Sequence, residues 1–268
     1  MIRPPAVAGR FYPDDPEQLR ETLDTLLVAK TKNKVRALAC LAPHAGYKYS
    51  GRVAAEVYGR LEIPSRVILV GPRHFPRGAP VAIISGGAWQ TPLGLAQIDA
   101  RLAGKVARSC PLLREDAIAH DAEHSIEVQL PFLQRLAESF AFVPIVIGTV
   151  QFGDLESLGH ALAEVIHSEP EPVLLVASSD MNHYESDDVT RVKDRKAIDC
   201  ILALEPRKLF DTVRNENISM CGYGATVAVL TAVRALGATH GELVCYATSG
   251  EVNGDLQEVV GYAGIIIN

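Results

Sequence analysis

The stretch Val67-Ile68-Leu69-Val70-Gly71-Pro72-Arg73-His74 joins an apolar run to a turn that carries a histidine. The run is short and aliphatic, and it ends at Gly71-Pro72, which is typical of a buried strand. Similar runs occupy 35–42, 140–147, 173–177, 243–248 and 259–267. Apolar residues with helical spacing lie within 19–27, 50–61, 155–166, 190–204 and 221–236. Strands that alternate with helices predict a mixed, mainly parallel sheet covered on both faces, in one three-layer α/β/α domain over residues 1–268.

Two local features add detail to this prediction. Pro144 lies inside the run 140–147, and proline is found in sheets chiefly on edge strands or at bulges. We therefore expect that strand at an edge or with a bulge. The run 81–85 and the turn 91–94 predict an additional pair of strands inserted between the main elements.

Composition excludes several classes of protein. The chain has 268 residues, of which 48% are hydrophobic, and a formal net charge of −6. The acidic balance argues against binding to nucleic acid, and no apolar run reaches the roughly 18–20 residues of a membrane helix. Residues 1–5 lack the apolar segment of a secretory signal, and the five cysteines show no CxxC spacing. We therefore expect a cytoplasmic protein that binds neither nucleic acid nor membrane.

Polar side chains follow three of the predicted strands at the point where each strand ends. His44 follows the run 35–42, His74 follows the run 67–70, and Asp180 and His183 follow the run 173–177. The carboxyl ends of parallel strands meet at one edge of a sheet, where α/β proteins bind ligands. If these strands are neighbours, the sequence predicts that the four side chains share a functional site. Each residue taken alone could equally be a surface or capping residue.

Cys221 begins the predicted helix 221–236. A helix N-terminus stabilises negative charge and can lower the pKa of a thiol, so Cys221 could be a metal-binding thiolate or a nucleophile. It could also be a small buried apolar residue. Cys40, Cys200 and Cys245 lie inside predicted strands or helices and are expected in the core.

The segment 120–130 concentrates acidic residues and histidines ahead of an apolar helix. His120 and His124 are four residues apart, as are Glu123 and Glu127, so on a helix each pair would share one face. His124 and Glu127 are candidates for lining the site. The spacing of the two pairs permits metal binding, but it is also common on solvated helix faces.

Five motifs, together with the opening segment 3–13, resemble the Memo family. They are Ala42-Pro43-His44-Ala45-Gly46-Tyr47, Gly71-Pro72-Arg73-His74, Glu123-His124-Ser125-Ile126-Glu127, Ser179-Asp180-Met181-Asn182-His183-Tyr184 and Cys221-Gly222-Tyr223-Gly224. The resemblance spans nearly the whole chain. It implies the fold of the LigB-like class III extradiol ring-cleavage dioxygenases. Prokaryotic members are named as protein B of an AmmeMemoRadiSam system, which implies radical-SAM and AMMECR-type partner proteins.

The resemblance also implies roles for individual residues. His44 and His74 match the two iron-binding histidines of the dioxygenases, and Cys221 stands where those enzymes have a glutamate ligand. His183 matches their acid/base histidine, and Asp180 matches the polar residue that accompanies it. The implied site therefore holds a metal through His44, His74 and Cys221.

The thiolate changes the expected chemistry. A softer ligand set favours Fe(II) or Cu(I), with Zn as a further possibility, and argues against catechol ring cleavage. The leading hypothesis is a mononuclear metal protein with a redox role, in which His183, oriented by Asp180, moves protons for a small-molecule or peptide ligand in a dioxygenase-like cleft. Two alternatives remain. One is a non-catalytic peptide- or protein-binding module, and the other is a cysteine-dependent hydrolase or transferase with Cys221 as nucleophile and His183 as base.

Overall fold

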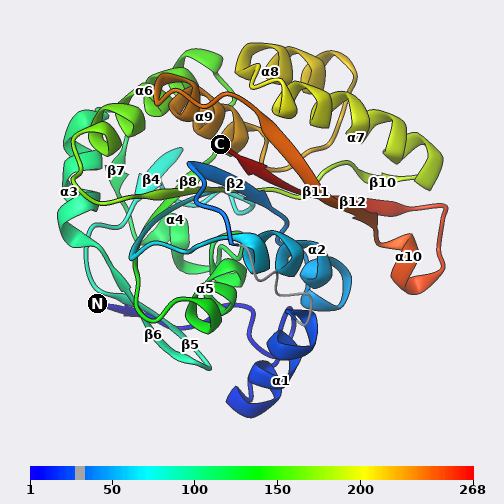
Figure 1. Ribbon diagram of the computed structural model, residues 1–268, viewed down its shortest axis with the longest axis horizontal. Coiled ribbons are helices and arrows are strands. Elements are labelled where there is room, and N and C mark those ends of the chain that lie inside the picture. The colour runs from blue at the N-terminus through cyan, green and yellow to red at the C-terminus, as the bar shows by residue number, and fades with distance from the viewer. Residues whose placement is uncertain (28–33) are drawn as a thin grey trace.

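The computed structural model describes residues 1–27 and 34–268 and has one large mixed sheet at its centre (Figure 1). The strands are β1 (Ile2–Arg3), β2 (Ala39–Ala42), β3 (Arg66–Pro72), β4 (Val81–Ile83), β5 (Ala88–Thr91), β6 (Gly94–Ile98), β7 (Arg114–Glu115), β8 (Ala141–Ile147), β9 (Leu174–Ser178), β10 (His183–Glu185), β11 (Gly241–Thr248) and β12 (Val259–Ile267). Their order is β1-β5-β6-β8-β3-β9-β2-β12-β10, with β11 paired to β12 and β4 to β7 and β8. The run from β6 to β2 is parallel throughout, whereas β12 pairs antiparallel with its neighbours.

Helices cover both faces of the sheet. They are α1 (Pro16–Leu26), α2 (Tyr47–Arg60), α3 (Ala100–Ser109), α4 (Ile118–Asp121), α5 (Leu130–Leu136), α6 (Phe152–His167), α7 (Asp187–Leu202), α8 (Pro206–Asn215), α9 (Tyr223–Ala235) and α10 (Gly250–Asn253), with the 3-10 turn η1 at Glu127–Gln129. Figure 1 shows α6, α7, α8 and α9 on one side of the sheet and α1, α2 and α5 on the other. The prediction of an α/β fold with a mainly parallel central sheet is therefore confirmed.

The central strands are buried from end to end because both faces are covered. Every residue of β2, β3 and β9 is buried, in agreement with the continuous apolar runs of the sequence. The turn 91–94 joins the antiparallel hairpin of β5 and β6, whereas the run 81–85 contains β4, which pairs with β7 and β8 instead. Among residues 1–27 and 34–268, no helix combines the length and hydropathy needed to cross a bilayer.

The prediction that the strand with Pro144 lies at an edge or carries a bulge is wrong. Strand β8 pairs with β3 along its whole length on one side. On the other side, β6 pairs with residues 141–142 and β4 with residues 145–147. Pro144 lies between the segments that these two partners cover. No neighbouring strand there requires a backbone N–H group, which proline lacks.

Several predicted boundaries also differ from the structure. Strand β2 begins at Ala39 rather than at residue 35. Helix α9 begins at Tyr223, so Cys221 precedes the helix instead of opening it. The segment 120–130 is broken between α4 and η1, so its residues do not share the faces of one helix. Helix α8 was not predicted at all.

Candidate metal centre

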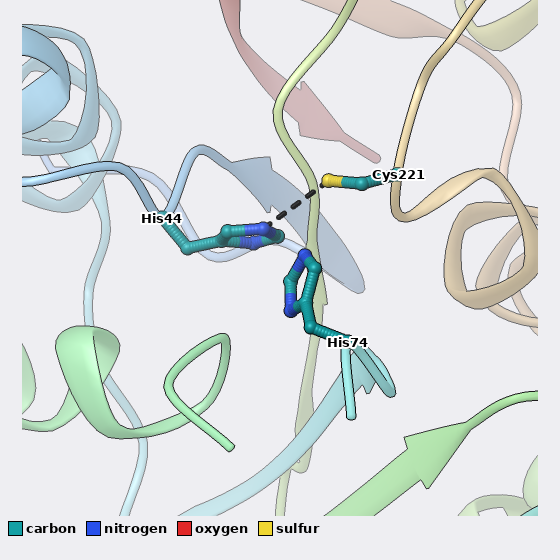
Figure 2. A group of neighbouring side chains, drawn as sticks. All are labelled: His44, His74 and Cys221. Carbon is teal, nitrogen blue, oxygen red and sulfur yellow. Dashed lines mark hydrogen bonds between the residues drawn. The ribbon is translucent and has the colours of Figure 1, made fainter. Parts of the chain in front are cut away.

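Three loops bring polar side chains to one edge of the sheet, because β3, β9 and β2 are adjacent parallel strands. His44 follows β2, His74 follows β3, and Asp180 follows β9. Cys221 reaches the same place from the segment between α8 and α9. Figure 2 shows the side chains of His44, His74 and Cys221 pointing toward one another. One ligand atom from each lies within 4.8 Å of the others.

His44 is fully enclosed, with a relative exposure of 1%. Its Nδ1 atom lies 2.9 Å from Ser178 Oγ, and its Nε2 atom lies 3.2 Å from Cys221 Sγ. Burial lowers the pKa of His44 well below its ordinary value, and the neighbouring His74 adds to this. His44 is therefore a neutral imidazole at neutral pH, which is the form that binds metals.

His74 is held by a buried carboxylate that the sequence did not indicate. Glu123 Oε1 lies 2.9 Å from His74 Nδ1, and the two oxygens also accept the backbone N–H groups of His74, His124 and Ser125. Through these bonds Glu123 orients His74. The Nε2 atom of His74 is left for a ligand, an arrangement common behind metal-binding histidines.

Cys221 is a neutral thiol in the metal-free protein. Burial raises the pKa of Cys221 above its ordinary value, and the charge of Asp180 raises it further. The predicted lowering by a helix N-terminus is therefore not found. Cys40 and Cys200 are buried as expected, whereas Cys245 is only half-buried.

Asp180 and His183 reach the site, but they are not bonded as predicted. Asp180 Oδ1 accepts the backbone N–H groups of His44 (2.7 Å) and Ala45 (3.3 Å), so it fixes the loop that carries His44. His183 is oriented by Ser219 instead. Its Nδ1 atom lies 2.9 Å from the Ser219 carbonyl oxygen, and its backbone N–H donates to Ser219 Oγ. Because a carbonyl can only accept, the proton of neutral His183 is on Nδ1, and its Nε2 atom carries the lone pair.

His124 lies beside the metal-ligand candidates. Its ring stacks on His74 with centroids 4.5 Å apart, and meets the ring of Phe11 edge-on at 4.8 Å. Burial is the largest influence on its pKa, which falls to about 4, so the side chain is neutral at neutral pH.

Glu127 has a structural role in place of the predicted pocket role. It is completely buried, and its oxygens bind Arg3 Nη1 (2.6 Å), Tyr12 Oη (2.7 Å) and the backbone N–H groups of Ala6 and Val7. Both oxygens are thus engaged by the N-terminal segment. Glu127 anchors that segment against η1, and the segment in turn places Phe11 beside His124.

The same family is found by comparison with known proteins. A family model described as "Memo-like protein" matches residues 3–266. The chain belongs to the Memo family. It is 43% identical to a MEMO1 family protein of Methanopyrus kandleri, with 99% of each chain covered. It is also 43% identical to a MEMO1 family protein of Aquifex aeolicus, with 99% of this chain and 98% of the relative covered.

A solved structure shares the fold at much lower sequence identity. The crystal structure of an uncharacterized protein from Escherichia coli K12 superposes with a TM-score of 0.59 and 14% identity. The match covers 86% of this chain and all of that one. This Memo-family chain therefore shares its α/β architecture with a protein of very different sequence.

The environment of Glu123 predicts that this residue contributes to how stability depends on pH in the acid range. Burial alone would raise the pKa of Glu123, but the hydrogen bond and charge of His74 outweigh it and bring the pKa to about 2. Glu123 therefore stabilises the fold above its unfolded pKa of about 4.5, and this contribution is lost as the pH falls toward 2. The full shift corresponds to about 3 kcal/mol. In Glu123→Gln, urea unfolding of the metal-free protein should show a flatter decline in stability below about pH 5.

A surface carboxylate provides the control for this prediction. Glu62→Gln removes an exposed partner of Arg36, and exposed ion pairs contribute little. It should keep the pH profile of the wild type. If stability in Glu123→Gln declines below pH 5 as steeply as in the wild type, Glu123 is not held ionised by its neighbours.

Proposed function

We propose that this Memo-family protein is a mononuclear redox metalloprotein that holds iron or copper through His44, His74 and Cys221. The observation that carries the proposal is the convergence of the three ligand atoms within 4.8 Å. Ligand atoms of a tetrahedral site lie about 3.4–3.6 Å apart, close to the 3.2 Å between His44 Nε2 and Cys221 Sγ. Both imidazoles are bonded through Nδ1, which supports coordination through Nε2.

The donor set fits a redox-active ion. Two imidazoles and one thiolate form a soft site that suits iron or Cu(I) better than hard cations. A metal of this kind would supply one-electron or oxygen chemistry to a bound ligand. A zinc ion would also fit the donors, but it does not change its oxidation state.

The proposed proton carrier is His183. With its Nδ1–H bonded to the Ser219 carbonyl, the Nε2 atom is free to accept or release a proton. His183 is half-buried, and its side chain is close enough to His44 to influence it electrostatically. We propose that Asp180 contributes by fixing the His44 loop, rather than by orienting His183.

The hydrolase alternative has little support in the geometry. Cys221 Sγ lies next to His44, not His183, and Asp180 is bonded to backbone N–H groups. Cys221, His183 and Asp180 therefore do not form the expected hydrogen-bonded arrangement of nucleophile, base and orienting acid.

The binding-module alternative is favoured by one observation. Phe75 and Tyr184 directly follow His74 and His183, and their exposed fractions are 44% and 74%. Their apolar surface lies next in sequence to two residues of the proposed site. A small molecule or peptide could use them whether or not the site holds a metal.

The test is elemental analysis of protein purified without air and without a metal-chelating tag. The proposal predicts about one iron or copper ion per chain, falling to less than about a tenth in Cys221→Ser. Cys245→Ser is the matched control, because Cys245 is half-buried and outside the site. Zinc alone would contradict the redox role. Absence of metal from both the wild type and the control would contradict the metal function and favour the binding module.

A further inference from the structure

A buried chain of hydrogen bonds runs from the core to His44. Tyr58 Oη lies 2.8 Å from Gln129 Oε1, Gln129 Nε2 lies 2.8 Å from Ser178 Oγ, and Ser178 Oγ lies 2.9 Å from His44 Nδ1. Tyr58, Gln129 and Ser178 are all completely buried. They come from α2, η1 and β9, so the tertiary fold creates this chain and no local motif contains it.

Two backbone carbonyls set the direction of these hydrogen bonds. Gln129 Nε2 lies 3.0 Å from the Pro43 carbonyl oxygen, so the nitrogen of the amide must be at that end. Ser178 Oγ lies 2.6 Å from the Ser125 carbonyl oxygen, which can only accept. The single hydroxyl proton of Ser178 is therefore used on Ser125, and Ser178 Oγ accepts from Gln129.

The remaining contact of Ser178 then has only one possible direction. With its proton already committed, Ser178 Oγ can only accept from His44 Nδ1–H. His44 must carry its proton on Nδ1, and its Nε2 lone pair faces Cys221 Sγ. Without Ser178, Nδ1 would have no acceptor, and an Nε2–H group could donate to the sulfur instead. That tautomer cannot offer Nε2 to a metal.

We propose that Ser178 and Gln129 are positioning residues that lock His44 in the Nδ1-protonated tautomer and so prepare its Nε2 atom for a metal. The inference rests on the proposed metal function for its purpose, but the tautomer itself is a property of the metal-free protein. The two histidines then differ in kind. His74 donates to the anionic Glu123, whereas His44 donates to a neutral hydroxyl. A carboxylate would hold the Nδ1 proton strongly, whereas at His44 the neutral hydroxyl of Ser178 provides the acceptor.

The first test reads the tautomer directly. Long-range proton–nitrogen NMR spectra of the metal-free protein should show His44 protonated at Nδ1 in the wild type. In Ser178→Ala the signal should move to the Nε2-protonated pattern, and Ser178→Thr, which keeps the hydroxyl, should retain the wild-type pattern. Thr231→Val removes a buried hydroxyl that donates to the Val227 carbonyl of its own helix, and it controls for general loss of packing.

The second test measures anaerobic binding of Co(II) as the probe. Removal of a group that orients a metal-binding histidine typically weakens binding 10–100-fold, and about that loss is expected for Ser178→Ala. Gln129→Met should show a smaller loss, because Ser178 keeps its bond to Ser125. It also provides a second variant if Ser178→Ala does not fold.

The outcomes separate this inference from the proposed function. If His44 remains Nδ1-protonated in Ser178→Ala, or if Ser178→Ala and Gln129→Met bind Co(II) within about twofold of the wild type, the positioning role is overturned. If the wild type itself binds no Co(II), the metal function fails, and the NMR result alone then decides whether Ser178 sets the tautomer.

Discussion

Replacing Gly222 by alanine is expected to destabilise the protein and to displace Cys221 from the two histidines. Gly222 adjoins Cys221, and its backbone N–H donates to Ser179 Oγ at 3.0 Å. A Cβ atom at this position would overlap the Ser178 carbonyl oxygen and come within 2.5 Å of Ser179 Cβ. Because one of these neighbours is backbone at the end of β9, the turn cannot relax by rotating a side chain. Overpacking of this kind costs about 1–3 kcal/mol.

The same substitution should weaken metal binding as well as lower stability. Cys221 and His44 are in contact, so a turn pushed away from β9 carries the thiol out of the group of three ligands. We expect urea unfolding to show the loss in stability, and Co(II) titration to show binding at least about tenfold weaker. Gly153→Ala is the matched control, because nothing lies within 4 Å of the added Cβ atom. Wild-type affinity in Gly222→Ala would show that this close approach does not position Cys221.

The edge of the sheet that carries the site could be predicted from the sequence. His44, His74 and Asp180 each follow an aliphatic run, and parallel neighbouring strands bring such positions together. One sequence does not reveal the order of the strands. However, histidines that follow the ends of several predicted strands indicated that these strands are neighbours. The family resemblance added Cys221 to this group, and the structure brings it next to His44.

The partners of these residues could not be predicted in the same way. Glu123 and His74 are 49 positions apart, and Gln129 reaches Ser178 across the same separation. Only the packed fold decides which buried acceptor faces which imidazole. The segment 120–130 was misinterpreted because its helical spacing is broken between α4 and η1, which turns Glu123 toward His74 and Glu127 toward the N-terminal segment.

Pro144 and Asp180 illustrate two further limits. Proline in β8 is compatible with a central position because its two partners on one side are short and leave a gap. Asp180 was expected to orient His183, but its carboxylate lies against the backbone of His44 and Ala45. A proline in a strand needs a position without a backbone hydrogen bond, and a buried aspartate needs hydrogen-bond donors. Only the tertiary structure shows where each requirement is met.

Replacing Cys221 by serine is expected to have the largest effect on metal binding, because it removes the softest ligand of the proposed site. Burial keeps the pKa of Cys221 above its ordinary value, so metal must displace a proton from the thiol. The apparent affinity should therefore increase with pH in the wild type. Loss of the thiolate should leave two imidazoles, and we expect Co(II) binding to weaken at least about a hundredfold.

The most direct measurement is the near-ultraviolet spectrum during anaerobic titration with Co(II). A thiolate bound to Co(II) gives an intense charge-transfer absorption that imidazole and carboxylate ligands do not give. The account predicts that this band saturates at about one Co(II) per chain in the wild type and in Cys245→Ser, and that it is absent in Cys221→Ser. Bound Co(II) without the band in the wild type, or the same band in Cys221→Ser, would contradict a metal centre of His44, His74 and Cys221.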